Sequence, residues 1–308
     1  MSAATLSPAP VLPSILAAIG HTPLVRLRLE GVPEGVAIWA KCEWFNPGGS
    51  VKDRTALSLI SEGERSGALR PGKTIIDSSS GNTAVGLALV GRAKGYPVEL
   101  LMPASVSKER RRLCEAYGAT ITLTDAFSGS DGALLKVRET VAQSPEKYFY
   151  ADQYRNPANP LAHYRTTGPE LWEQTGGQIT HFVAGLGTSG TVMGTGRWLH
   201  ERNPNIRVVA VEPDEPLHGL EGLKHMATAI RPEIYEPGLH DETLAVRTED
   251  AYEVASETLD ATGLFVGHSA AAALWAAREL ARSLRSGLIV ALLPDGGERY
   301  IQGSGSRR

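Results

Sequence analysis

Residues 46–54 read Asn-Pro-Gly-Gly-Ser-Val-Lys-Asp-Arg, and the apolar run Thr-Ala-Leu-Ser-Leu-Ile follows them at 55–60. The Pro-Gly-Gly turn fixes the backbone, Ser50 can cap a helix, and the apolar run would carry that helix into the core. We therefore expect Lys52 at a helix start, partly buried, where a lowered amine pKa would make it a nucleophile. Taken alone, the run is also typical of solvent-exposed charged residues at a helix start, so the choice between the two interpretations depends on other segments.

Short β-branched runs alternate with amphipathic segments along the whole chain. This order predicts an α/β fold of two three-layer αβα domains with twisted, mostly parallel sheets. The predicted strands are 36–41, 74–77, 98–102, 120–123, 179–184, 206–211 and 288–293, and the predicted helices are 52–64, 82–94, 107–117, 132–143, 190–201, 248–262 and 270–285.

The Asn/Pro-rich segment 156–160 is the predicted domain boundary. It separates an N-terminal domain, 16–155, from a C-terminal domain, 156–303, and residues 16–44 could pack with the second domain. The Ala/Ser/Pro-rich residues 1–15 and the tail 304–308 are predicted to be flexible.

Composition excludes several classes of function. A net charge of −3 and a pI near 6.3 argue against a nucleic-acid-binding surface. The two cysteines, Cys42 and Cys114, form no metal-binding motif, and the absence of a recognisable signal peptide makes a reducing cytoplasm the default. No apolar stretch reaches about 18 residues, so no membrane span is predicted.

The segment 78–83 reads Ser-Ser-Ser-Gly-Asn-Thr and lies between a predicted strand and a predicted helix. Its hydroxyls and backbone N–H groups could bind a carboxylate or a phosphate at the helix N-terminus. A plain loop with a Ser or Asn cap explains the same residues, and both readings stay open on this segment alone.

The segment 185–191 reads Gly-Leu-Gly-Thr-Ser-Gly-Thr and also joins a strand to a helix. It satisfies G-x-G-x-x-G, and Glu212 follows Gly190 at the spacing of a ribose-binding acid, so an NAD-dependent oxidoreductase is one alternative. Three hydroxyls in the loop suit a single phosphate better than a pyrophosphate. Pyridoxal 5′-phosphate (PLP) is the ligand that would use a lysine, a phosphate cup and a polar loop together.

Six segments in one order resemble the cysteine synthase family, that is, O-acetylserine sulfhydrylase and its O-phosphoserine-using relatives. These enzymes belong to the tryptophan-synthase-β-like PLP enzymes of fold type II. The resemblance covers roughly residues 16–303 and is carried by 19–27, the Lys52 motif, 80–83, 152–159, 163–170 and 187–191.

The resemblance implies a role for each matching position. Lys52 would hold PLP as a Schiff base and move the α-proton of the substrate, Asn82 would bond the 3′-oxygen of PLP, and Ser269 would face the pyridine nitrogen. The substrate carboxylate would be bound by Ser79, Ser80, Thr83 and Gln153. The phosphate cup would consist of Gly187, Thr188, Ser189, Gly190 and Thr191.

The resemblance also implies a β-substitution that makes L-cysteine from O-acetylserine or O-phosphoserine through an α-aminoacrylate intermediate. The sulfur donor would be sulfide or a carrier-protein thiocarboxylate. Lys224 aligns with an arginine of the O-phosphoserine-using branch, and a solvated surface lysine is the alternative reading of that position. Cystathionine β-synthase or diaminopropionate synthase activity would use the same PLP residues. A homodimer is expected, and a sulfur-carrier protein or serine acetyltransferase is a candidate partner.

Overall fold

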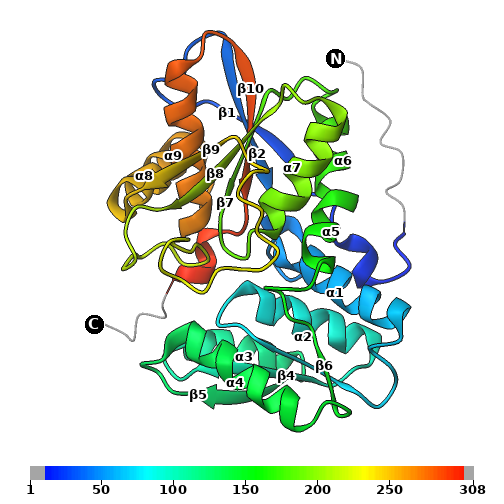
Figure 1. The fold of residues 1–308 in the computed structure, drawn as a ribbon. Helices are drawn as coiled ribbons and strands as arrows, with labels where there is room; N and C mark the ends of the chain where they lie inside the picture. The colour runs from blue at the N-terminus through cyan, green and yellow to red at the C-terminus, as the bar shows by residue number, and fades with distance from the viewer. Residues whose placement is uncertain (1–10, 302–308) are drawn as a thin grey trace.

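The computed structural model describes residues 11–301 (Figure 1). The predicted flexible tail, 304–308, lies outside the described residues, as do residues 1–10 of the predicted extension. The last residue of that extension begins a short 3₁₀ turn, η1 (Ile15–Ala18).

The smaller of two sheets is built from the first half of the chain. Its strands are all parallel and run in the order β5-β4-β3-β6. The strands are β3 (Thr74–Ser78), β4 (Val98–Pro103), β5 (Thr120–Thr124) and β6 (Tyr148–Tyr150), and the helices between them are α2 (Asn82–Lys94), α3 (Lys108–Ala116) and α4 (Gly129–Gln143).

The larger sheet has the order β1-β2-β10-β7-β8-β9 and is parallel except for the β1–β2 pair. Strands β1 and β2 come from the first half of the chain, so the two sheets do not divide the chain at one point. The strands are β1 (Leu24–Leu27), β2 (Val36–Cys42), β7 (His181–Gly185), β8 (Arg207–Pro213), β9 (Glu242–Val246) and β10 (Gly287–Leu293).

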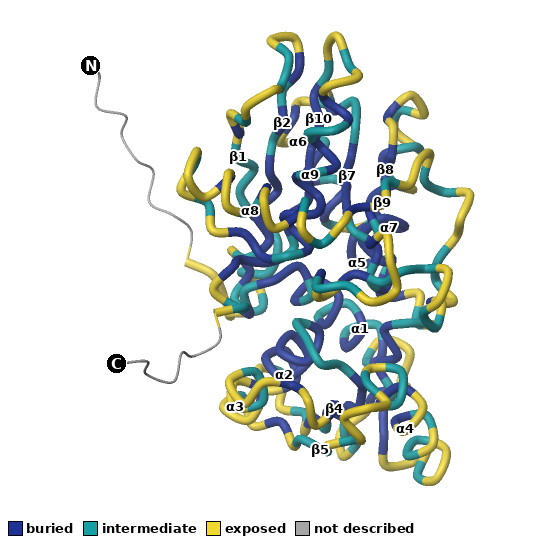
Figure 2. Tube along the Cα trace, turned by 90° about the vertical axis from the view of Figure 1, so that its left-hand side faces the viewer, coloured by how far each residue is buried: buried dark blue, intermediate teal, exposed yellow. Residues whose placement is uncertain are grey.

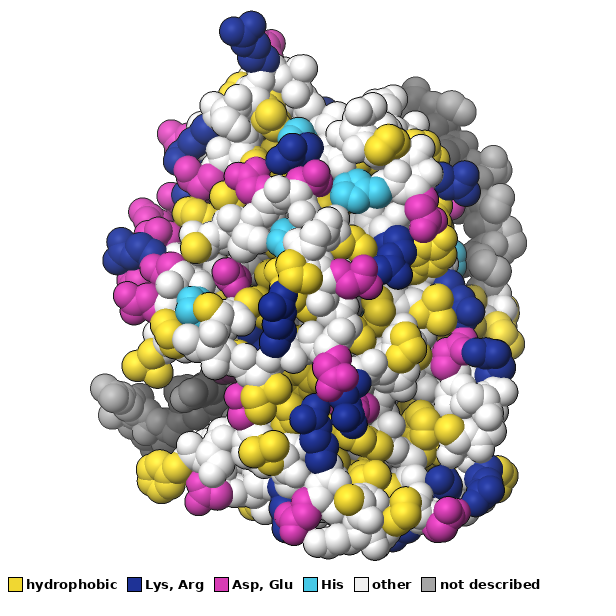
Figure 3. Space-filling view, viewed as in Figure 1, with side chains coloured by type: hydrophobic (Ala, Val, Ile, Leu, Met, Phe, Trp, Pro, Cys, Tyr) yellow, Lys and Arg dark blue, Asp and Glu magenta, His cyan; other side chains and the backbone are white. Residues whose placement is uncertain are grey.

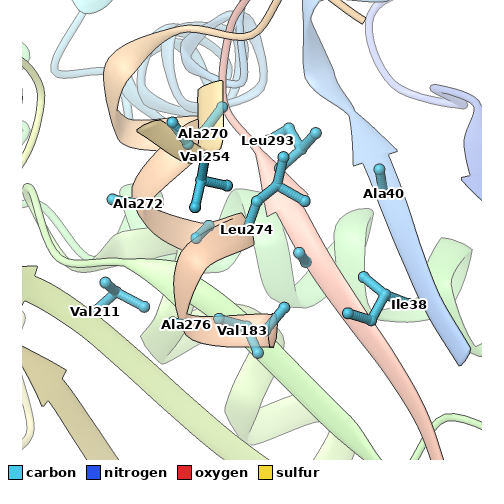
Figure 4. Packing of buried hydrophobic residues seen from close by; sticks show 14 of the residues in the cluster. Ile38, Ala40, Val183, Val211, Val254, Ala270, Ala272, Leu274, Ala276 and Leu293 are labelled. Carbon is cyan, nitrogen blue, oxygen red and sulfur yellow. The ribbon is translucent and has the colours of Figure 1, made fainter. Parts of the chain in front are cut away.

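The helices of the larger half are α5 (Ala158–Arg165), α6 (Thr167–Gln174), α7 (Gly190–Arg202), α8 (Thr248–Thr262) and α9 (His268–Ser283). Helix α9 packs on the sheet with an alanine-rich face. Figure 4 shows Ala270, Ala272 and Ala276 of this helix among side chains from β2, β7 and β8. Small side chains on a helix let its backbone approach the strands closely, which gives dense packing without large residues.

Helix α1 (Lys52–Ser66) joins the two halves. It packs against α2 on the side of the smaller sheet and against α5 on the side of the larger one, and α5 in turn packs on α7. Figure 2 shows this buried region between the two sheets. The mostly parallel, two-sheet α/β class predicted from the strand–helix alternation is confirmed.

Residues 156–160, the predicted domain boundary, include the first turn of α5, and Pro160 is accommodated there because the first turn needs no N–H donor. One local expectation, the Ser50 cap, was wrong. Val51, not Ser50, occupies the cap position of α1, although the Ser50 hydroxyl accepts a hydrogen bond from the Lys52 N–H at 3.3 Å. The strands β1, β6 and β9 and the helices α5 and α6 were not foreseen.

Candidate active site

A cavity of about 340 Å³ lies between the two halves of the molecule, at the ends of strands from both sheets. In parallel α/β folds ligands bind outside the carboxyl ends of the strands, which is where this cavity lies. Apart from Gly190, every residue predicted for the site lines it: Lys52, Ser79, Ser80, Asn82, Thr83, Gln153, Gly187, Thr188, Ser189, Thr191, Lys224 and Ser269.

Lys52 is fixed in this cavity by its neighbours in the chain. The Val51 N–H donates to the Pro294 carbonyl at 2.9 Å, and Ser50 forms a β-bridge with Asp295, so the start of α1 is fastened to the end of β10. Burial lowers the pKa of Lys52, and the nearby carboxylates of Asp295 and Glu43 oppose that shift. A half-buried lysine with a lowered pKa can supply a neutral amine, as predicted from the turn and helix.

The loop between β3 and α2 is held to Gln153 by a set of hydrogen bonds. The Thr83 hydroxyl donates to Gln153 Oε1 at 2.7 Å, and Gln153 Nε2 donates to the Ser78 carbonyl at 3.2 Å. Asp77, which the sequence analysis did not single out, accepts the N–H of Ser78 at 2.7 Å and that of Gln153 at 3.3 Å. Asp77 therefore holds the backbone of Ser78 and the backbone of Gln153 in place together.

Asn82 lies at the start of α2 and belongs to a second network. Its Nδ2 donates to Asp295 Oδ2 at 2.6 Å, and its Oδ1 accepts from Arg299 Nη1 at 3.0 Å. Tyr300 also donates to Asp295 Oδ2, at 2.6 Å. Because an amide nitrogen carries two hydrogens, Asn82 keeps one donor for a ligand. Burial raises the pKa of Asp295, a residue two positions after β10 for which the sequence predicted no role.

The loop between β7 and α7 fits a phosphate group. Ser189 has a φ of 70°, and its buried hydroxyl has no hydrogen-bond partner among the described residues. A side chain at Gly187 would collide with the Gly222 carbonyl, so only glycine fits there. Backbone N–H groups and the helix dipole at the start of α7 favour an anion at this point. The orphaned hydroxyl and the glycine cradle therefore match the cup predicted for PLP.

Ser269 and Lys224 approach the cavity from the larger half. Ser269 is in the first turn of α9, is 4% exposed and lies beside Gly222. The Lys224 side chain is only 13% exposed, and its Nζ lies 3.4 Å from Asp131 Oδ1 and 5.2 Å from the centre of the Tyr154 ring. Lys224 thus borders the cavity and is not a freely solvated surface residue.

Two further observations bear on other classes of function. Glu212 Oε2 accepts the Met226 N–H at 3.0 Å, so the acid that suggested a dinucleotide site bonds the protein backbone. Between residues 11 and 301, no helix is both long enough and apolar enough to cross a bilayer, and no acidic, His and Cys side chains gather in a group that could hold a metal ion. On the face in Figure 3, basic and acidic side chains are interspersed.

Comparison with known proteins places the chain in a family of enzymes. The model of the pyridoxal-phosphate dependent enzyme family matches residues 15–295, and the chain belongs to that family. A cysteine synthase of Aquifex aeolicus is 54% identical over 295 residues, which cover 94% of this chain and 90% of the relative. Cysteine synthase B of Escherichia coli K12 is 41% identical over 283 residues, 92% of each chain.

A solved structure shows the same fold. Cysteine synthase of Entamoeba histolytica superposes with a TM-score of 0.92 at 34% identity, covering 98% of this chain and 93% of that one. Within the PLP-dependent enzymes, the chain therefore groups with the cysteine synthases, as the six ordered motifs predicted. PLP is the cofactor, and the NAD-dependent alternative is set aside.

Proposed function

We propose that this enzyme makes L-cysteine by β-substitution on an O-activated serine. The observation that carries the proposal is the convergence of Lys52, the polar loop at 78–83 and the phosphate cup at 187–191 on one cavity. The cysteine synthase relatives, which match over nearly the whole chain, support it.

PLP, when bound, supplies the electron-withdrawing ring that makes the α-proton of an amino acid acidic. Lys52 would hold the cofactor until the amino group of the substrate displaces it, and the freed Lys52 amine, kept neutral by its lowered pKa, would then take that proton. The N–H groups and hydroxyls of the cup would bind the phosphate, Asn82 would bond the 3′-oxygen, and Ser269 would bond the pyridine nitrogen.

The carboxylate of the substrate would be held by the hydroxyls of Ser79 and Ser80 and by the second hydrogen of Gln153 Nε2, while Thr83 donates its hydroxyl proton to Gln153 Oε1. Gln153 is already fixed by Thr83 and by the Ser78 carbonyl, so little side-chain freedom is lost on binding. Fixing the carboxylate places the α-proton within reach of Lys52, and a filled pocket keeps water away from the reacting carbons.

The leaving group is the open part of the proposal. Lys224 borders the cavity, and Arg110 also lines it while donating to the Ser80 carbonyl at 3.0 Å. Two cations favour departure of a phosphate, and Asp131 and Glu221 offset part of their charge. We therefore favour O-phosphoserine, with O-acetylserine as the alternative. The sulfur donor is sulfide or a thiocarboxylated carrier protein.

The remaining proposals concern the setting of the enzyme. We propose a homodimer in the cytoplasm, with serine acetyltransferase or a sulfur-carrier protein as the candidate partner. Cys42 and Cys114 are both buried free thiols, as a reducing compartment would allow. Sedimentation of the purified protein measures the oligomeric state directly.

Absorption spectra during separate additions of O-phosphoserine and O-acetylserine test the reaction. We expect the visible band of the bound cofactor to shift with both compounds, at a lower concentration of O-phosphoserine. A shift with O-acetylserine alone would refute the phosphate preference. A band that responds to neither compound would refute the β-substitution.

A further inference from the structure

Helix α5 carries two buried polar side chains, Asn159 and His163, against the N-terminal turn of α7. Asn159 is 1% exposed and His163 is fully buried. The helices approach this closely because Gly190 and Gly194 of α7 have no side chain. A side chain at Gly190 would collide with Asn159 Oδ1, and one at Gly194 would collide with the Pro160 carbonyl. The glycine spacing of the phosphate loop thus also makes room for α5.

The directions of the hydrogen bonds around Asn159 follow from one group that can only accept. The backbone carbonyl of Gln153 lies 2.7 Å from Asn159 Nδ2, which fixes the orientation of the amide. The second hydrogen of Nδ2 is donated to Thr188 Oγ1 at 3.0 Å. Asn159 Oδ1 is then an acceptor, so the Thr55 hydroxyl, 3.3 Å away, donates to it.

The same reasoning fixes the tautomer of His163. Because Thr55 has donated its single hydroxyl proton, it can only accept from His163 Nε2 at 3.4 Å, and Nε2 must carry the ring proton. That N–H also faces Thr191 Oγ1 at 3.3 Å, and Nδ1 accepts from the Thr167 hydroxyl at 2.9 Å. Burial, together with the nearby Arg54 cation, lowers the pKa of His163 to about 3, so the ring is neutral.

Thr188 and Thr191 are the two threonines of the phosphate cup, and each receives an N–H from a fixed donor. A hydroxyl whose lone pair is occupied in this way turns its own proton toward another acceptor. We propose that Asn159 and His163 are positioning residues that aim the hydroxyl protons of Thr188 and Thr191 at the cofactor phosphate. This inference rests on the proposed role of the cup.

Binding of two ligands to cofactor-free protein tests the inference, because pyridoxal has the ring of PLP but no phosphate. Asn159→Leu removes one donor without adding charge, His163→Asn removes the other because its shorter amide does not reach the position of Nε2, and His163→Gln keeps an N–H near that position. We expect the two donor-deleting variants to bind PLP about 10- to 100-fold more weakly, the loss typical of one hydrogen bond to a charged group. Pyridoxal binding should change less than about twofold, and His163→Gln should retain most of the PLP affinity.

The outcomes distinguish this inference from the proposed function. Equal weakening of PLP and pyridoxal would mean that the residues only support the fold, and unchanged PLP affinity would also overturn the inference. A wild-type chain that binds PLP no better than pyridoxal would instead overturn the phosphate role of the cup, on which the proposed function depends.

Nitrogen-15 NMR of the histidine rings supplies a readout that needs neither cofactor nor activity. We expect His163 in the cofactor-free protein to show the pattern of a neutral ring protonated at Nε2 from about pH 5 to about pH 9. His163→Gln identifies its signals by their loss. A ring protonated at Nδ1, or a ring that becomes charged within this range, would overturn the assigned hydrogen-bond directions.

Discussion

Removing the negative charge of Glu170 should destabilise the protein strongly. Glu170 lies in a buried cluster of two cations and two anions that ties β2, α1 and α6 together. Its Oε2 accepts from Lys41 Nζ and from Arg54 Nη2, both at 2.7 Å, and its Oε1 accepts from Arg54 Nη1 at 2.6 Å. Glu43 neutralises the other half of the charge through Arg54 Nε at 2.7 Å. The cluster is balanced, so removing one anion leaves a buried cation unpaired.

Breaking a buried ion pair from one side costs about 3–5 kcal/mol. With an unfolding entropy of about 2.1 cal/mol/K per residue, Glu170→Gln should lower the melting temperature of this chain by about 5–8 °C. Calorimetry or circular dichroism of the variant measures the change. Glu173→Gln, an exposed glutamate on the same helix, is the matched control and should cost less than about 0.5 kcal/mol.

A double variant tests whether charge balance is the cause. Lys41→Met combined with Glu170→Gln removes one cation and one anion, so it should be less destabilising than the sum of the two single changes. Additive effects, or a Glu170→Gln variant as stable as Glu173→Gln, would refute the reasoning.

Three other perturbations give separate tests. The free energy of unfolding of the wild type should fall as the pH drops from about 6.5 toward about 3, because His163 binds a proton in the unfolded chain but stays neutral when buried in the folded one. His163→Gln should remove up to about 1.4 kcal/mol per pH unit of that fall. Parallel plots of unfolding free energy against pH for the two proteins would contradict this. Gly190→Ala should lower the free energy of unfolding, measured with urea, by about 1–3 kcal/mol, because the new side chain collides with Asn159. An unchanged free energy would show that α5 can move to make room for it. Lys224→Gln should lower kcat/KM for O-phosphoserine about 10- to 100-fold and change that for O-acetylserine less than about threefold, whereas equal losses would assign Lys224 a structural role.

Much of the fold could be predicted because local signals and tertiary structure agree. The predicted helix 82–94 coincides with α2 because Gly81 precedes it and Gly95, with a φ of 79°, ends it. Strands β1 and β9 were missed because they are short and mostly not buried, so their sequences lack a clear apolar pattern. Helix α5 was missed because its Asn and Pro residues also describe a loop.

The candidate site also contains residues that the sequence indicated and residues that it did not. Lys52, the polar loop and the phosphate cup could be found because each joins a turn signal to the start of a helix. No role could be assigned to Asp295 or Asn159 from the sequence, because their importance comes from contacts with residues distant in the chain. Asp295 meets Asn82 across 213 positions, and Asn159 meets Thr55 across 104.

Lys52 carries the cofactor in the proposed mechanism, and borohydride reduction followed by peptide mass spectrometry measures this directly. We predict that the mass of the reduced cofactor appears on the peptide that contains Lys52. The Lys52→Ala variant should take up no covalent cofactor and show no amino-acid-dependent change in absorption. A modification on another lysine, or a Lys52→Ala variant that still forms cysteine, would contradict the account.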